Sequence, residues 1–411
     1  MLDFTEEQKL AQSAMGQWCA QNLEPHVRAM EAGTVSVYPT MRAMAATFGI
    51  PDMARAGFAK MKEAAKSDVP KEKAEKGGRR GDGQAAMMAI LMMELSRCCP
   101  GFALAFGASL GLFGGAVMAR GTLEQKEKWA LPVLTLEKIG AWALTEPGAG
   151  SDAFGSMRTT ARRVDDADGG WVLKGSKTFI TNAPFADSFV VYARTSEAAA
   201  GGQTGEGEDV RAFLVDRTAK GVATSAPFAK MGMHASPTGE IFLDDVHVAA
   251  DQLLGGETAT SSRAAAKASL SNERFGMTPM CLGMIERCLA ESVKYAKERT
   301  QWGKPIAAFQ LVQEKLATMF TARTIVRTLL LRQLEAEQTG APLTAEEASA
   351  TKLYCARATM NCALEAVQLM GGAGYMTGSV VEMMARDAKL FQIGGGTDEI
   401  QILRIAREIL A

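Results

Sequence analysis

The stretch ALTEPGAGSD, residues Ala143–Asp152, stands where the texture of the sequence changes. Before it, residues 1–138 are rich in helix formers with helical periodicity. After it, residues 139–250 hold short β-type runs that are separated by Gly- and Asp-rich turns. Long helical stretches return over residues 251–411. The sequence therefore predicts an N-terminal α-helical domain, a central small β-sandwich or barrel domain, and a C-terminal helical bundle domain.

Composition is that of an ordinary globular protein. The chain has 411 residues, of which 47% are hydrophobic and 22% charged, and its formal net charge is −1. This length is enough for two or three domains with a large core. This net charge argues against a nucleic-acid surface, and the local basic stretch Lys76–Arg80 is interpreted as solvated loop, so we expect no nucleic-acid partner.

Three further features bear on compartment and metals. Met1–Lys9 is polar and acidic, unlike a signal peptide. Phe102–Ala119 carries no charge over about the length of a bilayer, but its four glycines favour a buried helix over a membrane span. The seven cysteines lack metal-ligand spacing, and there are only three histidines. These features predict a cytoplasmic protein with reduced, buried thiols, no metal and no membrane span.

Four short motifs follow the opening stretch, and each suits a ligand site. Phe179 and Thr181 lie two apart on a predicted strand and share one face, as an aromatic ring and a hydroxyl that could hold a flat cofactor. Arg299 has the planar fork that suits a pyrophosphate. Taken singly, the motifs are also compatible with a core strand, a solvated helix end and ordinary glycine turns. They are GSKTFITNA at Gly175–Ala183, RTQWGKP at Arg299–Pro305, QLMGGAGY at Gln368–Tyr375 and IGGGTDEIQ at Ile393–Gln401.

All five motifs, in this order, resemble the acyl-CoA dehydrogenase family over most of the chain. The resemblance implies an α+β fold of the acyl-CoA dehydrogenase type, with the three domains named above. It also implies non-covalently bound FAD and oxidation of the Cα–Cβ bond of an acyl-CoA substrate. Electron transfer flavoprotein would then accept the electrons, and the assembly would be a homotetramer.

The resemblance assigns FAD contacts residue by residue. Within the subunit, Thr181 would lie near flavin N5 and the Phe179 ring beside the isoalloxazine. Thr397 and Glu399 would sit at the pyrophosphate and adenine half of the cofactor. The other expected contacts, several of them to the FAD of a neighbouring subunit, are Trp142, Leu144, Thr145, Gly150, Ser151, Ile180, Arg299, Gln301, Trp302, Phe309, Gln310, Gln368, Gly371 and Gly372.

One departure from the family pattern concerns the catalytic base. Many members carry a glutamate where this chain has Gly395, in IGGGT. In a minority, including the isovaleryl and long-chain types, the glutamate lies at the start of a C-terminal-domain helix, which here begins LSNERF with Glu273. The resemblance implies that Glu273 removes the α-proton and that the Gly395 backbone N–H binds the thioester carbonyl. Further substrate contacts would come from Ser151, Asn272, Arg274 and Gly396.

Several alternatives stay open from the sequence. Glu273 can also be an acid that is favoured by the positive end of a helix dipole. Without a base, the chain would be a non-catalytic partner subunit of a heteromeric acyl-CoA dehydrogenase. An oxygen-using acyl-CoA oxidase or flavin monooxygenase of the same fold would carry similar motifs. A flavin-free CoA-binding or scaffold protein is a further alternative, in which the FAD motifs would bind no cofactor.

Overall fold

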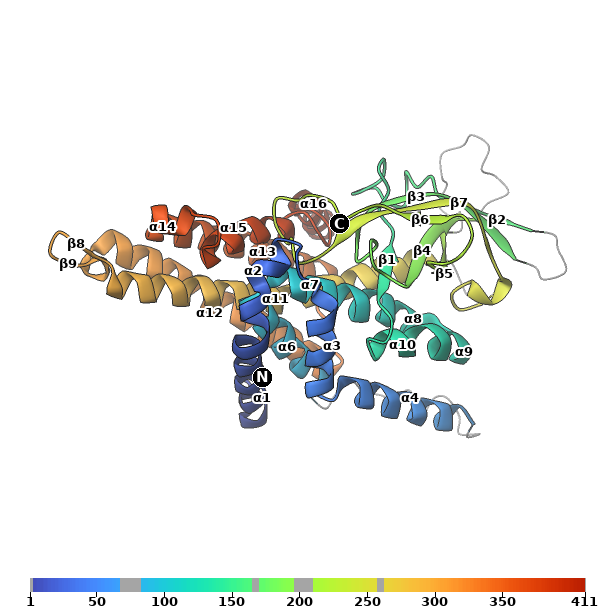
Figure 1. Cartoon of the computed structure of the whole chain (residues 1–411), viewed down its shortest axis with the longest axis horizontal. Helices are drawn as coiled ribbons and strands as arrows, with labels where there is room; N and C mark the ends of the chain where they lie inside the picture. Colours follow the sequence, from blue (N-terminus) through green and yellow to red (C-terminus); the bar gives the residue numbers. More distant parts are fainter. Residues whose placement is uncertain (1–2, 67–82, 165–169, 196–209, 257–261, 411) are drawn as a thin grey trace.

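The computed structural model describes most of the chain. Within residues 262–274 it describes the backbone but not the side chains. Helices from the two ends of the chain pack together, and one curled β-sheet lies at one end of the molecule (Figure 1). The predicted order of a helical, a β and a second helical region is therefore confirmed. The described ranges are 3–66, 83–164, 170–195, 210–256 and 262–410.

The N-terminal region is helical, and its first helix begins where the sequence supplies a cap. The Thr5 side chain accepts the Gln8 N–H, and the Gln8 side chain accepts the Thr5 N–H, which together form a capping box. The helices of this region are α1 (Glu6–Trp18), η1 (Cys19–Leu23), α2 (Glu24–Glu31), α3 (Val37–Thr47), α4 (Ile50–Lys66), α6 (Gln84–Cys98), α7 (Pro100–Gly107), η2 (Ala108–Gly114), α8 (Gly115–Arg120), α9 (Leu123–Gln125), η3 (Lys126–Ala130) and α10 (Leu131–Leu134).

The uncharged stretch of the sequence forms a core helix. Helices α7, η2 and α8 join into one helix over Pro100–Arg120, with a π-helical segment in the middle. Among the described residues this is the one helix long and apolar enough to cross a membrane, and 61% of it is buried inside the fold. Gly140, which opens the first strand, abuts Phe113 so closely that a Cβ atom would lie 2.4 Å from the ring. The helix thus packs directly against the sheet.

The central region forms one sheet of seven strands. Its order is β1-β4-β2-β3-β7-β6, and β5 pairs with β4. Most pairs are antiparallel, but β4 runs parallel to β1 and β2. The strands are β1 (Gly140–Ala143), β2 (Thr160–Arg163), β3 (Trp171–Thr181), β4 (Ser188–Arg194), β5 (Val210–Asp216), β6 (Val222–Thr224) and β7 (Thr238–Val248), followed by the short helix η4 (Ala250–Gln252).

Strand β4 shows why the sheet is covered on both sides. Successive side chains of a strand point to opposite faces. Phe189 and Val191 belong to the main core, which the N-terminal and C-terminal helices share. Val190 and Tyr192 belong to a second, smaller core with Trp129 of η3. A strand that is apolar on both faces is typical of a buried central position.

The C-terminal region is a helical bundle that packs against α6 through its longest helix. Gly283 permits this contact, because a Cβ atom there would lie 2.1 Å from the Met93 carbonyl oxygen. The elements of this region are α11 (Ser262–Glu298), β8 (Thr300–Gln301), β9 (Lys304–Pro305), η5 (Ile306–Ala308), α12 (Gln310–Thr339), α13 (Ala345–Met370), α14 (Gly372–Tyr375), α15 (Val380–Phe391) and α16 (Asp398–Leu410).

The start of α11 corrects one expectation. The helix was expected to begin near Glu273, but it begins at Ser262. The preceding stretch SRAAAKASL consists largely of strong helix formers, which favour extension of the helix towards the N-terminus. Glu273 therefore lies in the helix interior, where a dipole-favoured role at the N-terminus does not apply.

Candidate active site

The loop after β1 is held in place by a buried ion pair between Glu146 and Lys177. Lys177 Nζ lies 2.8 Å from Glu146 Oε1, and both side chains are buried. The same ammonium group donates to the Leu144 carbonyl at 3.1 Å. Glu146 also accepts the backbone N–H groups of Arg158 and Thr159. The pair therefore ties the loop after β1 to strand β3.

Burial and the ion pair act in opposite directions on the pKa of each partner. Burial favours the neutral form of Glu146, but Lys177 and the hydrogen bonds from the loop outweigh it, so the pKa of this carboxyl is below its usual value. Burial lowers the pKa of Lys177 to about 8, and Glu146 opposes that shift. A charged pair in this position stabilises the loop, while loss of either partner would leave a buried charge without its partner.

Strand β3 presents an aromatic ring on its open side. Phe179 adopts a left-handed backbone conformation, with φ of 57°, at a register shift between Lys177 and Ile180. Its side chain is 69% exposed, whereas Ile180 is buried. Thr181, two residues further, is half-buried. The Phe179 ring also makes an edge contact with Phe228, at 5.9 Å between centroids.

Trp142 of β1 has a fixed orientation. Its indole Nε1 donates to the Tyr192 hydroxyl at 3.3 Å, and the two rings meet edge to face. Arg120 donates to the same hydroxyl at 2.7 Å. The indole N–H is thus engaged within the protein, so a ligand would meet the half-buried ring and not its polar atom.

The remaining predicted residues of this loop differ in what they can offer a ligand. The Leu144 side chain is buried, and the Thr145 carbonyl accepts the Thr178 N–H at 2.9 Å. Gly150 and Ser151 are exposed. The polar groups that this part of the chain presents are therefore the backbone of the glycine turn and the Ser151 hydroxyl.

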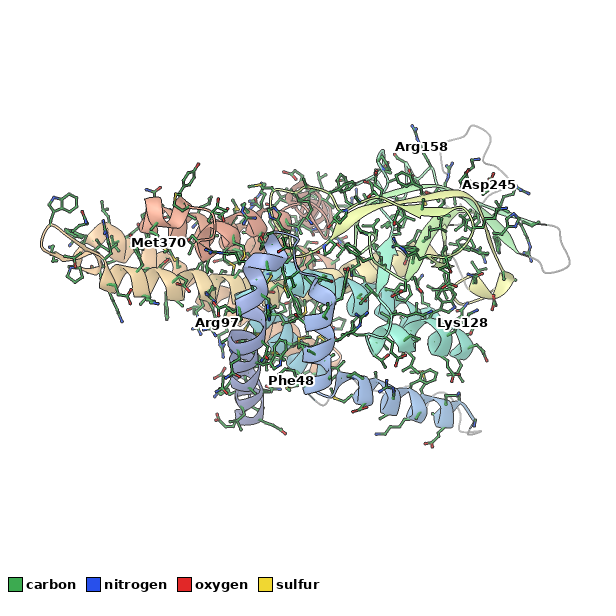
Figure 2. All side chains as sticks on the ribbon, in the orientation of Figure 1. Phe48, Arg97, Lys128, Arg158, Asp245 and Met370 are labelled. Carbon is green, nitrogen blue, oxygen red and sulfur yellow. The ribbon has the colours of Figure 1, made fainter. Side chains whose placement is uncertain are left out.

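A second group of predicted cofactor residues lies far from the first. The hairpin of β8 and β9 and helix α14 lie at one end of the molecule, and the β-sheet lies at the other (Figure 1). Figure 2 shows Met370, which directly precedes this group's glycines, well apart from Arg158 beside the Glu146 loop. Within a single folded chain, the two groups of predicted cofactor residues therefore do not form one site. The distant group is Arg299, Gln301, Trp302, Phe309, Gln310, Gln368, Gly371 and Gly372.

The glycine loop connects α15 to α16. Gly395 is buried, with φ of 63°, and Gly396 follows with φ of 91°. Both values lie in the left-handed region that favours glycine. The Thr397 side chain then accepts the Ile400 N–H at 3.3 Å and begins α16. Glu399 is exposed in the first turn, where backbone N–H groups and Thr397 hold its pKa below the usual value.

The proposed base and its neighbours are placed by backbone alone. Glu273 lies inside α11, and its side chain, like those of Asn272 and Arg274, lies outside the described residues. Helix α11 packs against α13 and α15. The helix that carries Glu273 therefore adjoins the helix that leads into the Gly395 loop.

Sequence reasoning missed three buried charged residues of the site. Glu146 and Lys177 stand inside two of the motifs, and charged residues within otherwise apolar or glycine-rich motifs are a usable signal. Lys352 is buried in α13 and donates to the Gly396 carbonyl, but nothing in its local sequence distinguishes it from a surface lysine. Only the packing of α13 against the loop reveals it.

Comparison with known proteins agrees with this architecture. Family models match three successive parts of the chain, namely the acyl-CoA dehydrogenase N-terminal domain over 5–137, the middle domain over 141–246 and the C-terminal domain over 263–410. A 3-(aryl)acrylate reductase from Clostridium sporogenes is 34% identical over 99% of both chains.

Two solved structures are similar over nearly all of this chain. Butyryl-CoA dehydrogenase from Megasphaera elsdenii is 29% identical with a TM-score of 0.83, and the match covers 100% of both chains. An acyl-CoA dehydrogenase complexed with FAD from Bacillus anthracis is 30% identical with a TM-score of 0.81, covering 99% of this chain and 67% of that one. The fold and the matched domains define an acyl-CoA dehydrogenase, and the chain belongs to that family. The predicted family and fold class are thus confirmed.

Proposed function

We propose that the protein uses FAD to oxidise the Cα–Cβ bond of an acyl-CoA thioester to the trans-2-enoyl-CoA. The observation that carries this proposal is the open face of β3. Phe179 holds an exposed aromatic ring on a left-handed backbone, two residues after Lys177 of the buried pair with Glu146. Such backbone strain costs on the order of 1–3 kcal/mol in a non-glycine residue and gathers at functional sites.

The residues around this face fit a flavin. A Cβ atom added to Gly148 or Gly150 would have no neighbour within 4 Å, so the loop leaves open space beside β3. Ser151 is exposed in this loop, and Thr145 and Thr181 are half-buried. When bound there, FAD supplies the acceptor for the β-hydride at flavin N5. The Bacillus anthracis relative was solved in complex with FAD, which supports the same cofactor here.

We assign the α-proton abstraction to Glu273. An α-proton beside a thioester is weakly acidic, so its removal needs a positioned carboxylate and donors at the developing enolate oxygen. Gly395 has no side chain to act as base, and Glu273 lies inside the helix that adjoins the helix before the Gly395 loop. The Gly395 N–H would bind the carbonyl, with Ser151, Asn272, Arg274 and Gly396 as further substrate contacts.

The substitution Glu273→Gln tests this assignment. We expect bound FAD to be retained and turnover with an artificial electron acceptor to fall by roughly three orders of magnitude or more, because general-base catalysis contributes that much. Glu291→Gln, on the same helix and paired with Arg287, is the matched control and should keep turnover. Near wild-type turnover of Glu273→Gln would contradict the assignment. A flavin-bound wild type that turns over no acyl-CoA would instead support a non-catalytic partner subunit.

We further propose a homotetramer with electron transfer flavoprotein as acceptor. The distant group of predicted FAD residues supports assembly, because it would reach a cofactor held by a neighbouring subunit. Large apolar side chains are also exposed along α12, α13 and α16, and a groove of about 700 Å³ runs between these helices. Exposed apolar surface of this kind is typical of subunit contacts. Light scattering during size-exclusion chromatography tests the assembly, and a monodisperse monomer would contradict it.

One relative favours a second candidate substrate. The Clostridium sporogenes protein is named for a 3-(aryl)acrylate, whose conjugated Cα=Cβ bond is the bond that dehydrogenation of a 3-arylpropanoyl thioester produces. We therefore propose aryl-bearing acyl groups beside aliphatic ones, in either direction of the reaction. A panel of butyryl-CoA, isovaleryl-CoA and 3-phenylpropanoyl-CoA, assayed with an artificial acceptor, distinguishes them. The same panel with air as the only acceptor tests the oxidase alternative, and cell fractionation tests the proposed cytoplasmic location.

A further inference from the structure

Lys352 of α13 is a buried cation that contacts the glycine loop. Its side chain is 1% exposed. The ammonium group donates to the Gly396 carbonyl at 2.8 Å and lies 3.8 Å from Asp398 Oδ1. An ion taken out of water costs several kcal/mol unless partners replace the lost hydration. Burial of this ammonium group therefore costs stability, which its hydrogen bond to the loop and the nearby carboxylate offset.

Gln401 of α16 holds the same loop from the neighbouring helix. Its side chain is fully buried, and its Nε2 donates to the Gly396 carbonyl at 3.0 Å and to the Gly395 carbonyl at 3.3 Å. Two buried side chains thus make three hydrogen bonds to two successive carbonyl groups. Both carbonyls consequently point towards the interface of α13 and α16.

The geometry of the peptide group carries this orientation to the N–H groups. In a trans peptide the C=O and N–H bonds lie in one plane and point in opposite directions. The Gly395 carbonyl points towards Gln401, so the Gly396 N–H points away from it. The Gly396 carbonyl points towards Lys352, so the Thr397 N–H points away from that side as well. The donors of this segment are turned towards the opposite face of the loop.

Gly395 is also anchored on its other side. The N–H groups of Ile393 and Gly394 donate to the Leu390 carbonyl at 2.9 and 2.8 Å, at the end of α15. Gly395 therefore lies between one fixed turn and two fixed carbonyls. Its left-handed conformation, with φ of 63°, follows from those anchors and not from a side chain of its own.

We propose that Lys352 and Gln401 are positioning residues that hold the backbone of Gly395 and Gly396 in the conformation in which this loop binds the thioester carbonyl. This inference rests on the proposed function, in which the Gly395 N–H binds that carbonyl. Donors that are already oriented need no reorganisation when negative charge develops on the carbonyl oxygen. A loop of three glycines would otherwise sample many conformations, because glycine loses more freedom on ordering than any other residue.

The positive charge of Lys352 adds a second contribution. A cation that donates to a carbonyl polarises that peptide group and strengthens the hydrogen bond which the N–H of the same group donates. Lys352 donates to the Gly396 carbonyl, so the peptide group that it polarises carries the Thr397 N–H, directly after the two glycines. A neutral donor in its place would keep the loop geometry and lose this electrostatic part, so the two contributions can be separated by substitution.

The test measures how much the protein prefers a thioester over the matching thioether. Pivaloyl-CoA has no α-hydrogen and cannot be dehydrogenated, and S-neopentyl-CoA lacks only the carbonyl oxygen. Isothermal titration of the FAD-loaded protein gives the ratio of the two dissociation constants, which reports the hydrogen bonds to the carbonyl. We expect Lys352→Met to reduce the thioester preference by roughly twofold to tenfold, the usual effect of weakening one neutral hydrogen bond.

Two further substitutions complete the test. Gln401→Leu should also reduce the preference, and it decides the question by itself if Lys352→Met fails to fold. Lys315→Met, which breaks the ion pair with Glu365 on the neighbouring helix, is the matched control and should leave the preference unchanged. Unchanged preference in both Lys352→Met and Gln401→Leu would overturn the inference while the proposed function stands. A wild type without any thioester preference would refute the proposed role of the Gly395 N–H, and the inference with it.

Discussion

Two buried lysines hold two different loops of this protein, and they differ in how their charge is balanced. Lys177 donates to the Leu144 carbonyl and has the Glu146 carboxylate at 2.8 Å. Lys352 donates to the Gly396 carbonyl, and the Asp398 carboxylate lies 3.8 Å away. The carboxylate lies within hydrogen-bond distance of the first ammonium group and 1.0 Å further from the second. The first pair ties the loop after β1 to β3, and the second lysine holds the glycine loop, for which we propose a positioning role.

The largest expected effect comes from breaking the first pair. Lys177→Met leaves the Glu146 carboxylate buried without its cation, which typically costs about 3–5 kcal/mol of unfolding free energy. We also expect weaker FAD binding, because the loop after β1 loses its tie to β3. Chemical denaturation and flavin fluorescence measure the two effects.

The double substitution Lys177→Met with Glu146→Leu is compared with Lys177→Met alone. Replacing both charges with apolar groups removes the unpaired carboxylate, so part of the lost stability should return. FAD binding should remain weak, since the two loop N–H groups of Arg158 and Thr159 lose their acceptor. A double variant no more stable than Lys177→Met would show that the pair is not the source of the loss.

A third buried charge extends the comparison to pH. Asp387 of α15 accepts the Met233 N–H, and burial together with the nearby Glu31 raises the pKa of Asp387 to about 7. Because the folded protein binds this proton more tightly than the unfolded chain, stability from this group falls as the pH rises from about 4 to about 7. The full span from 3.8 to about 7 corresponds to at most about 4 kcal/mol.

Asp387→Asn should remove that pH dependence. From pH 5 to pH 8 the unfolding free energy of the wild type should fall relative to that of Asp387→Asn, because Asn does not titrate. Denaturant titrations at these pH values give the difference directly, and titrating groups that do not interact with Asp387 cancel in it. A difference that is constant with pH would contradict the raised pKa.

A smaller effect is expected at Gly395. A side chain there must adopt φ of 63°, which costs an L-residue on the order of 1–2 kcal/mol. Gly395→Glu, which restores the residue found in many relatives, should therefore fold and bind FAD with a modest loss of stability. Thermal unfolding and the flavin spectrum check this outcome. Failure to bind FAD would contradict the assignment of this loop.

The smallest effect is expected at the exposed partner of Asp398. Arg357 Nε lies 3.0 Å from Asp398 Oδ2, but more than half of the Arg357 side chain is exposed. Exposed ion pairs contribute about 0–1 kcal/mol. We therefore expect Arg357→Met to lower the unfolding free energy by no more than about 1 kcal/mol. A loss as large as that of Lys177→Met would show that Asp398 depends on Arg357 and that Lys352 does little to balance it.

Much of the fold could be predicted because its signals are local. Helix α13 begins at Thr344, whose capping box with Glu347 is visible in the sequence, and α12 ends at Gly340 in the left-handed conformation. Strands β1 and β6 have only four and three residues, and so short a run carries little periodicity from which a strand could be predicted. Helix α11 begins at Ser262 and not near Glu273, because the Ala-rich stretch before Glu273 also favours a helix.

The site was predictable only in part. Its motifs indicated the aromatic ring of Phe179 and the missing side chain at Gly395 from the sequence. The tie between Glu146 and Lys177 joins residues from two different motifs, and pairing across a sheet depends on register, which no single motif encodes. Lys352 lies on a helix with no motif at all, so its contact with Gly396 could not be anticipated.

The sequence by itself determined the order of helical and β regions, the family, and the absence of a carboxylate at Gly395, because these depend on residue identity and local propensity. Only the tertiary structure decided which lysines are buried and to which carbonyls they donate. It also decided that the two groups of predicted cofactor residues lie at opposite ends of the folded molecule. The physical reason is that a buried charge is tolerated only where partners from distant segments replace its hydration. That condition exists only after the chain has folded.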